Sequence, residues 1–469
     1  MDSASGGAGL PGGNAGGDFG ATQGGIQDMS LARDTIAAGR VPAPEAFVVE
    51  AMFSEHDLPI EGEPCSTLLC LRAASGVAPS EEGAPAGWVQ VGMSSTIDPE
   101  TFVRPSLSIV AVVDVSGSMG WEYGENGTPG GLSKSLLQEV ARQLGEGDRF
   151  SIVTYGSSSR LHLSPTPGGN QETILAAIES LTEAGSTNME AGMRLGYEVA
   201  RDEIERAEQV RLMLFTDVQP NVGLTSSSEF ERLAKEGSNG DVGLTVFAVG
   251  LGLNPDVLRG MSQIRGANAF SLTKPEDVPA LMADSWPWMV SPIAYELDLR
   301  VSASEGFTVG QGYGFPESTL NEASLTVSTV FLSRRRGALL LRIDPPAETD
   351  LDELSVEVAL DYQTAEGDEV SQAFVKDFPS LDGEPSFEQV GVHKTVALAR
   401  LISSMKAAAE LYGAERDSAI SIMQAAHVRF EQVADALEDP DLERERELSA
   451  DLLTLMREGA SQDSFYGGF

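Results

Sequence analysis

Three oxygen-bearing side chains follow an apolar run in the first third of the chain, spaced two residues apart. The run Leu107–Val113 is followed by Asp114, Ser116 and Ser118. Residues two apart on an extended chain project to the same side, so these side chains can face one point beyond the end of a strand. A carboxylate with two hydroxyls is an all-oxygen donor set, which suits Mg²⁺ or, as substitutes, Mn²⁺ or Ca²⁺. By itself, this spacing also fits a solvated serine loop.

Two further segments strengthen the metal interpretation. Thr187 lies in the loop Ala184–Met189, just before an amphipathic segment, and Asp217 follows another apolar run. In an open α/β sheet, ligands bind at the carboxyl ends of the strands, where such loops gather. The sequence therefore predicts a metal site made of Asp114, Ser116, Ser118, Thr187 and Asp217.

The elements that must position these residues lie between 105 and 290, where apolar runs alternate with amphipathic segments. Runs that are apolar on both faces are typical of central strands in a parallel sheet covered by helices on each side. The expected strands are Leu107–Val113, Phe150–Tyr155, Val210–Phe215 and Leu244–Val249. The expected helices are Leu132–Leu144, Glu172–Leu181, Met189–Arg206, Ser228–Glu236 and Val278–Ser285. This order predicts a doubly wound, mostly parallel α/β domain.

The flanks have a different organisation. Alternation of apolar and polar residues from 294 onward predicts an antiparallel sheet, and the strands expected at 67–95 have only these to pair with, so both flanks form one β-sandwich. Short helices are expected at Asp28–Ala38 and Glu45–Phe53, and a three-helix unit closes the chain. The predicted parts are a Gly-rich tether (1–27), the N-terminal helices and strands (28–104), the α/β domain (105–290), the second part of the sandwich (291–380) and the helical unit (385–460).

Residues 105–290 resemble the von Willebrand factor A domain with its metal-ion-dependent adhesion site. All five predicted ligands match that site in order, and Gly147–Val153 is similar to the family's second strand. The resemblance implies direct metal contacts from Ser116, Ser118 and, in one state, Thr187, with Asp114 and Asp217 acting through water. It also implies a non-enzymatic protein-binding or adhesion function, in which a partner's carboxylate supplies the last ligand.

The sequence departs from the family pattern at two places. Val218 stands where the family often has Gly, which narrows the site without removing a ligand. The loop Gly120–Ser133 is long and carries Glu122 and Glu125. It is either a solvated turn or a lid whose glutamate fills the open metal position.

The compartment is less defined. Val41–Phe47 and the β-rich flanks resemble bacterial proteins, often exported, that embed this domain, which favours the cell surface or periplasm. No signal peptide is visible, so a cytoplasmic location is the alternative. No apolar run reaches the roughly 18–20 residues of a membrane span.

The net charge and the two cysteines exclude several kinds of partner and metal site. The formal net charge of -40 excludes nucleic acid and anionic membranes as direct electrostatic partners. Cys65 and Cys70 match no zinc pattern. Two free, buried thiols are favoured over a short-loop disulfide.

Two other functions are considered. Ser116–Gly120 resembles a hydrolase nucleophile elbow with Ser118 as nucleophile, although the elbow's first Gly is Ser116 here. His393 and His427 are the only histidines after Asp217, and both lie on predicted helices, which favours structural roles. The remaining alternative is a scaffold with a vestigial metal site. The chain is therefore not expected to be an enzyme.

Overall fold

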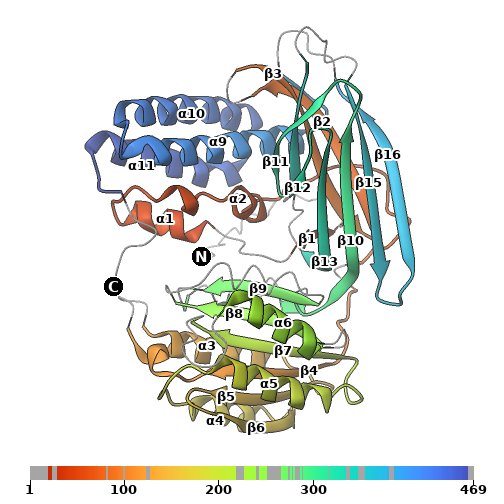
Figure 1. Cartoon of the computed structure of the whole chain (residues 1–469), viewed down its shortest axis with the longest axis vertical. Helices are drawn as coiled ribbons and strands as arrows, with labels where there is room; N and C mark the ends of the chain where they lie inside the picture. The colour runs from red at the N-terminus through yellow and green to blue at the C-terminus, as the bar shows by residue number, and fades with distance from the viewer. Residues whose placement is uncertain are drawn as a thin grey trace, which may run out of the picture.

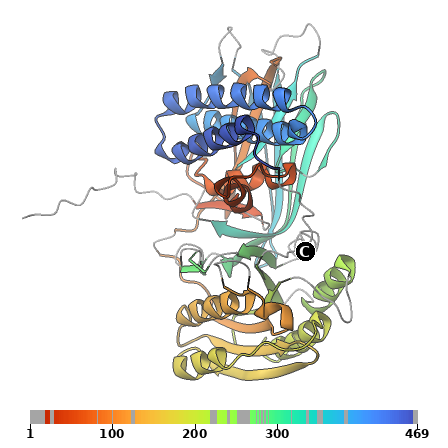
Figure 2. The same ribbon diagram turned by 90° about the vertical axis from the view of Figure 1, so that its left-hand side faces the viewer.

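The computed structural model contains an α/β domain, a β-sandwich and a group of helices, which lie at the bottom, upper right and upper left of Figure 1. Figure 2 shows the helices in front of the sandwich and the α/β domain below both. The structure describes all residues except 1–18, 24–28, 81–82, 99–100, 123–126, 218–225, 239–241, 251–265, 273–274, 277, 280–281, 283–285, 288, 316, 334–337, 347–353, 380–384 and 463–469.

The α/β domain is built on a sheet with the strand order β6-β5-β4-β7-β8-β9. Neighbouring strands are parallel except at the β6 edge, where β6 is antiparallel to β5. The strands are β4 (Leu107–Asp114), β5 (Arg149–Tyr155), β6 (Ser159–Pro167), β7 (Gln209–Thr216), β8 (Val242–Val249) and β9 (Ala267–Leu272). This arrangement confirms the predicted doubly wound, mostly parallel α/β fold.

Helices cover both faces of this sheet. They are α3 (Pro129–Arg142), α4 (Gln171–Glu179), α5 (Met189–Arg201) and α6 (Ser227–Ser238). Ile109 of β4 packs in the core that α3 and α4 cover, whereas Val110 packs in the core that α5 and α6 cover. Burial on both sides explains why β4 is apolar without alternation. The predicted helix Val278–Ser285 lies partly outside the described residues.

Strand β6 was not predicted from the sequence. It is an edge strand, and most of its side chains are half-buried or exposed, including Leu161 at 42% exposure. It also contains Pro165 and Pro167, which are tolerated only at an edge because proline cannot donate a ladder hydrogen bond. The strand therefore carries no continuous apolar run.

The sandwich draws its strands from both sides of the α/β domain in the sequence. β3 pairs with β14, with Val89 opposite Leu341, which confirms the prediction that strands at 67–95 pair with those at 294–376. The strand bounds are β2 (Leu69–Pro79), β3 (Pro85–Ser95), β10 (Pro292–Ala303), β11 (Thr308–Tyr313), β12 (Glu317–Ser318), β13 (Glu322–Ser333), β14 (Leu339–Asp344), β15 (Ser355–Thr364), β16 (Glu369–Asp377) and β17 (Ser386–Phe387). The half containing β3 and the half containing β10 share one core, with Val91 and Leu299 among its members.

Part of the Gly-rich N-terminal tract is ordered, which corrects the prediction of a tether over residues 1–27. Strand β1 (Phe19–Gln23) pairs with β13, where Ala21 lies opposite Leu332, and with β3, where Phe19 lies opposite Ser95. It thus joins the two halves of the sandwich. Composition did not reveal this strand because its backbone bonds depend on two strands distant in sequence. The rest of the predicted tether lies outside the described residues.

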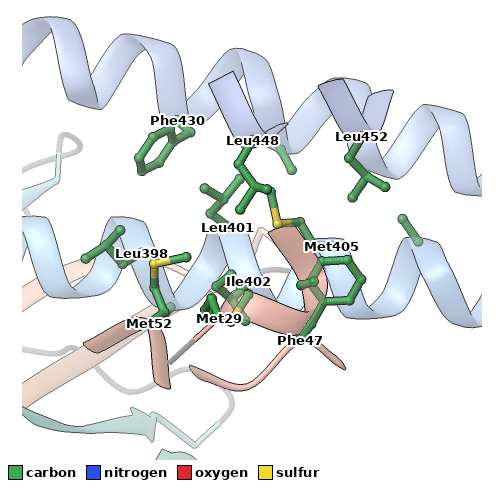
Figure 3. Close-up of a cluster of buried hydrophobic side chains, with 14 of the residues drawn as sticks. Met29, Phe47, Met52, Leu398, Leu401, Ile402, Met405, Phe430, Leu448 and Leu452 are labelled. Carbon is green, nitrogen blue, oxygen red and sulfur yellow. The ribbon is translucent and has the colours of Figure 1, made fainter. Parts of the chain in front are cut away.

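The helices form a separate core against the outer face of the sandwich (Figure 3). They are α1 (Ser30–Ala37), α2 (Val49–Glu55), α9 (Val390–Tyr412), α10 (Arg416–Leu437) and α11 (Glu443–Glu458). The start of the helix expected at Glu45–Phe53 is instead a 3₁₀ turn, Pro44–Ala46. Trp88 of β3 packs in this core, whereas its neighbour Val89 packs inside the sandwich. Because successive side chains of a strand point to opposite faces of the sheet, β3 contributes to both cores.

A buried guanidinium marks the contact between the α/β domain and the sandwich. Arg211 is 2% exposed and donates to the carbonyl oxygens of Leu244 and Gly266 at 3.1 and 3.2 Å. Its guanidinium also lies 5.3 Å from the ring centre of Phe331 on β13. Burial lowers the pKa of Arg211 to about 10. This contact forms at the starts of the parallel strands, opposite to the ends that carry the predicted metal ligands.

The two cysteines are bonded to each other, which corrects the expectation of free, buried thiols. Cys65 and Cys70 form a disulfide with Cα atoms 5.5 Å apart, and both residues are half-buried. The bond closes a short loop between the segment before β2 and the start of β2.

Among the described residues, none of the helices combines the length and apolar composition that a membrane crossing requires.

A buried carboxylate ties the helices together and gives a test of this packing. Glu445 is fully buried and accepts a hydrogen bond from Arg33 at 2.5 Å, and His56 Nε2 lies 3.3 Å from its other oxygen. Burial opposes ionisation of Glu445, but hydrogen bonds and charges from His56 and Arg33 outweigh it and hold its pKa below the usual value. We expect Glu445→Gln to lower the free energy of unfolding by about 3–5 kcal/mol, because Arg33 then faces a neutral amide in place of a fully buried carboxylate.

Urea unfolding of the whole chain measures this loss. Glu447→Gln is the matched control, since Glu447 is exposed on the same helix, and it should change stability by less than about 0.5 kcal/mol. Equal midpoints for the two variants would show that the buried contact does not stabilise the helices.

Candidate metal centre

The predicted ligands lie at one rim of the α/β sheet because two neighbouring strands end there. β4 and β7 are adjacent and parallel, with Val113 opposite Phe215. Asp114 is the last residue of β4, and Asp217 directly follows β7. The main chain alone therefore brings the two carboxylates to the same edge of the sheet.

The loop after β4 is shaped by the carboxylate that precedes it. The Ser116 N–H donates to Asp114 Oδ1 at 2.8 Å, and the Oγ atoms of Ser116 and Ser118 lie 3.1 Å apart. A short 3₁₀ helix, Gly117–Gly120, follows. The two hydroxyls are thus already within the separation of neighbouring ligands on one ion.

Backbone hydrogen bonds hold the loop that carries Thr187 against the loop that follows β4. The Gly117 N–H donates to the Gly185 carbonyl at 2.9 Å, and the Ala184 N–H donates to the Val115 carbonyl at 2.7 Å. Gly185 has a φ of +91°, a conformation that favours glycine. Thr187, two residues later, is only 1% exposed. The structure therefore places Thr187 in the loop that contacts the serine-bearing loop.

Two buried acids make this rim electrostatically strained without a cation. Asp114 is 1% exposed and Asp217 is 3% exposed. Burial raises the pKa of Asp114 to about 7, the charge of Asp217 adds to this rise, and hydrogen bonds from Ser116 oppose it. A positive charge at the rim would reverse this penalty.

The donor set fits a hard divalent cation. It contains two carboxylates and three hydroxyls, and Mg²⁺ prefers oxygen ligands of this kind. Within the described residues, no group of three or more His, Cys, Asp or Glu side chains is arranged to hold a metal. An ion here would therefore depend on the hydroxyls of Ser116, Ser118 and Thr187 as well as on the acids.

Sequence reasoning missed two residues that contact or face Asp114. The Thr216 hydroxyl donates to Asp114 Oδ2 at 3.4 Å. Tyr155, fully buried at the end of β5, lies opposite Asp114 in the sheet. Burial and then the charge of Asp114 raise the pKa of Tyr155 well above its usual value. The sequence did contain a signal for both residues, because each is a polar side chain at the end of an apolar run.

The loop glutamates and the histidines give a mixed result. The side chain of Glu122 is exposed, and Glu125 lies outside the described residues, so the proposed lid remains a prediction. His393 stacks on Phe387, with ring centres 4.2 Å apart, and His427 Nδ1 lies 2.9 Å from the Ser449 hydroxyl. These contacts lie in and beside the helical unit, so they do not assemble a catalytic group with Ser118.

Comparison with known proteins identifies the domain. Residues 109–219 match the model of the von Willebrand factor type A domain. The uncharacterized protein YfbK of Escherichia coli (strain K12) is 35% identical over 146 residues, which are 31% of this chain and 24% of YfbK. Inter-alpha-trypsin inhibitor heavy chain H4 of Sus scrofa is 23% identical over 201 residues, 42% of this chain and 21% of that protein. The chain therefore spans about a quarter or less of the length of these relatives.

Two solved structures are among those to which this chain is similar. A von Willebrand factor type A protein from Catenulispora acidiphila has 12% identity and a TM-score of 0.48, covering 84% of this chain and 97% of its own. The ArnB paralog VWA2 from Sulfolobus acidocaldarius has 16% identity and a TM-score of 0.40, covering 85% of this chain and 100% of its own.

Calorimetric titration tests metal binding at the rim. We expect Mg²⁺ and Mn²⁺ to bind with about one ion per chain, as an octahedral oxygen site implies. Asp114→Asn should remove the binding heat because it removes one of the two acids. Glu205→Gln changes an exposed acid in the same domain and should leave the heat intact. Equal heats for wild type and Asp114→Asn would rule out this site.

The pH dependence follows from Asp114. Its pKa of about 7 in the folded chain lies above the ordinary value of 3.8, so the metal-free fold retains a proton that the unfolded chain loses. Stability of the metal-free chain should therefore fall as pH rises from about 4 to 7. Mg²⁺ competes with that proton, so its affinity should increase with pH up to about 7 and then level off.

Titrations in two buffers with different heats of ionisation measure the protons released. Near pH 6, Mg²⁺ should release up to about one proton per ion. A pH-independent affinity, with no proton released, would show that Asp114 is already ionised without metal.

Proposed function

We propose that this chain, which contains a von Willebrand factor type A domain, is a non-enzymatic protein-binding or adhesion protein that depends on a divalent metal. Asp114, Ser116, Ser118, Thr187 and Asp217 hold Mg²⁺, or Mn²⁺ or Ca²⁺ in its place. A carboxylate from a protein partner completes the ligand set. The observation that carries this proposal is that two buried acids and two serine hydroxyls lie at one rim of the sheet. The Oγ atoms of the two serines are 3.1 Å apart.

The distribution of charge at the rim supports a carboxylate as the partner's ligand. Ser116 and Ser118 are neutral donors, whereas the buried acids Asp114 and Asp217 lie at the ends of the neighbouring strands β4 and β7. Neutral direct ligands leave a bound cation with net positive character toward the partner, which favours an anionic oxygen there. The net charge of -40 repels a partner's acidic groups from the rest of the surface, so recognition of the partner's carboxylate concentrates at this rim.

A hydrolytic function has less support. Ser118 has Ser116 as its side-chain partner, and the histidines that follow Asp217 in sequence make their contacts in and beside the helical unit. A serine nucleophile needs a base within hydrogen-bonding reach. The described residues near Ser118 are therefore better suited to binding than to acyl transfer.

A scaffold with a vestigial metal site is the second candidate. The size of the sandwich and helical cores supports a structural role, and it requires no metal. The two functions differ in one respect, because only the binding function requires the buried acids at the rim. Metal-dependent capture of a ligand therefore separates them.

We further propose a compartment outside the cytoplasm, at the cell surface or in the periplasm. The Cys65–Cys70 disulfide supports this location, since such bonds form and persist mainly in oxidising compartments. The similarity to bacterial proteins that are often exported points the same way.

A displayed library of random peptides tests the carboxylate mechanism, because random sequences offer every kind of side chain to the rim. In Mg²⁺, the peptides selected by the chain should carry Asp or Glu, and a chelator should release them. Thr187→Ala should weaken their binding, whereas Ser158→Ala, on an exposed neighbouring loop, should not. Selected peptides that lack an acid and stay bound in chelator would contradict a metal-bridged mechanism.

A further inference from the structure

We propose that Trp121 is a second contact for the partner beside the metal, and that it receives a basic side chain adjacent to the coordinating carboxylate. This proposal rests on the proposed function. It specifies the partner as a protein segment in which an Arg or Lys lies close to a single Asp or Glu.

The first observation is the exposure of Trp121. Its side chain is 70% exposed, whereas Trp88 and Trp286 are 0% and 2% exposed. An indole offers a large apolar area on few rotatable bonds, which is why tryptophan is enriched among residues that dominate binding energy. A single exposed apolar residue is common on protein surfaces, so its position decides whether it matters here.

That position is beside the predicted metal ligands. Trp121 directly follows the 3₁₀ helix Gly117–Gly120, and its N–H donates to the Ser118 carbonyl at 3.0 Å. A hydrogen bond of this kind spans one turn of chain. The indole is therefore attached one turn away from a residue that we place in direct contact with the metal.

The surroundings of Trp121 are acidic. Glu122 is exposed next to it in sequence. A Cβ atom added to Gly120 would lie 3.7 Å from Glu183 Cβ, so Glu183 lies beside the residue that precedes Trp121. Lys134 Nζ is 4.0 Å from Glu183 Oε1 and offsets only part of this charge.

These charges select the group that Trp121 receives. A partner segment rich in acids would be repelled by Glu122 and Glu183, and by the net charge of -40 as it approaches. A guanidinium or ammonium group is attracted both by the acids and by the face of the indole ring. The partner's one carboxylate therefore binds the metal while its neighbouring cation binds the ring.

An array of synthetic decapeptides tests the proposal on the full chain in Mg²⁺. Each peptide carries a central Asp flanked by Arg, by Leu or by Glu, and a matched set carries Asn in place of Asp. Arg-flanked Asp peptides should bind tighter than Leu-flanked ones by about two- to fivefold, the range expected of an exposed cation–aromatic contact. Glu-flanked peptides should bind weakest.

Variants assign this preference to the ring. Trp121→Ala should abolish the preference for Arg, whereas Trp121→Phe should retain part of it because an aromatic face remains. Leu161→Ala removes another exposed apolar side chain of the same domain, 42% exposed on β6, and should leave the preference unchanged. Thermal melting checks that each variant is folded.

The outcomes separate the two proposals. Binding of Asp peptides but not Asn peptides, with no flank preference in wild type or with a preference that survives Trp121→Ala, would overturn the role of Trp121 and leave the proposed function intact. A preference for Leu flanks that Trp121→Ala abolishes would overturn the basic partner. Binding that ignores both the Asp→Asn change and chelator would overturn the proposed function, and this inference with it.

Discussion

Two carboxylates, Asp114 and Asp217, are buried where neighbouring strands of the α/β sheet end, and their charges must be balanced there. Burial raises the pKa of Asp114 to about 7. In the proposed function a divalent cation would offset both charges, with the hydroxyls of Ser116 and Ser118 as further ligands. Under this proposal, metal binding and partner binding would depend on the same constraint, which is that burying a charged acid is costly without a counter-charge.

The rest of the structure maintains this rim. Helices on both faces keep β4 and β7 adjacent and parallel, and main-chain bonds from Gly117 and Ala184 hold the serine-bearing loop against the loop that carries Thr187. The sandwich attaches at the opposite ends of the strands, through the buried guanidinium of Arg211. The domain is thereby anchored at the strand starts, away from the edge that carries the candidate metal centre.

The parts of the fold that local spacing determines were predictable. Asp114 and its two serines follow from a strand with side chains of period two, and the alternation of apolar strands with helices indicates the doubly wound sheet. The role of Tyr155 was not predictable, because it depends on the register that places it opposite Asp114. Strands β1 and β6 were missed since one lies in Gly-rich sequence and the other is a half-exposed edge. The Cys65–Cys70 bond depends on a Cα separation that spacing does not fix.

Crystals of the full chain grown with Mn²⁺ test the central claim most directly, because anomalous scattering locates the ion. The account predicts one strong peak at the rim, within coordination distance of Ser116 Oγ and Ser118 Oγ, with Asp114 and Asp217 close by and one ligand position facing solvent or a neighbouring carboxylate. An ordered rim without a peak, at Mn²⁺ concentrations that saturate binding in solution, would contradict it. So would a peak held by other residues.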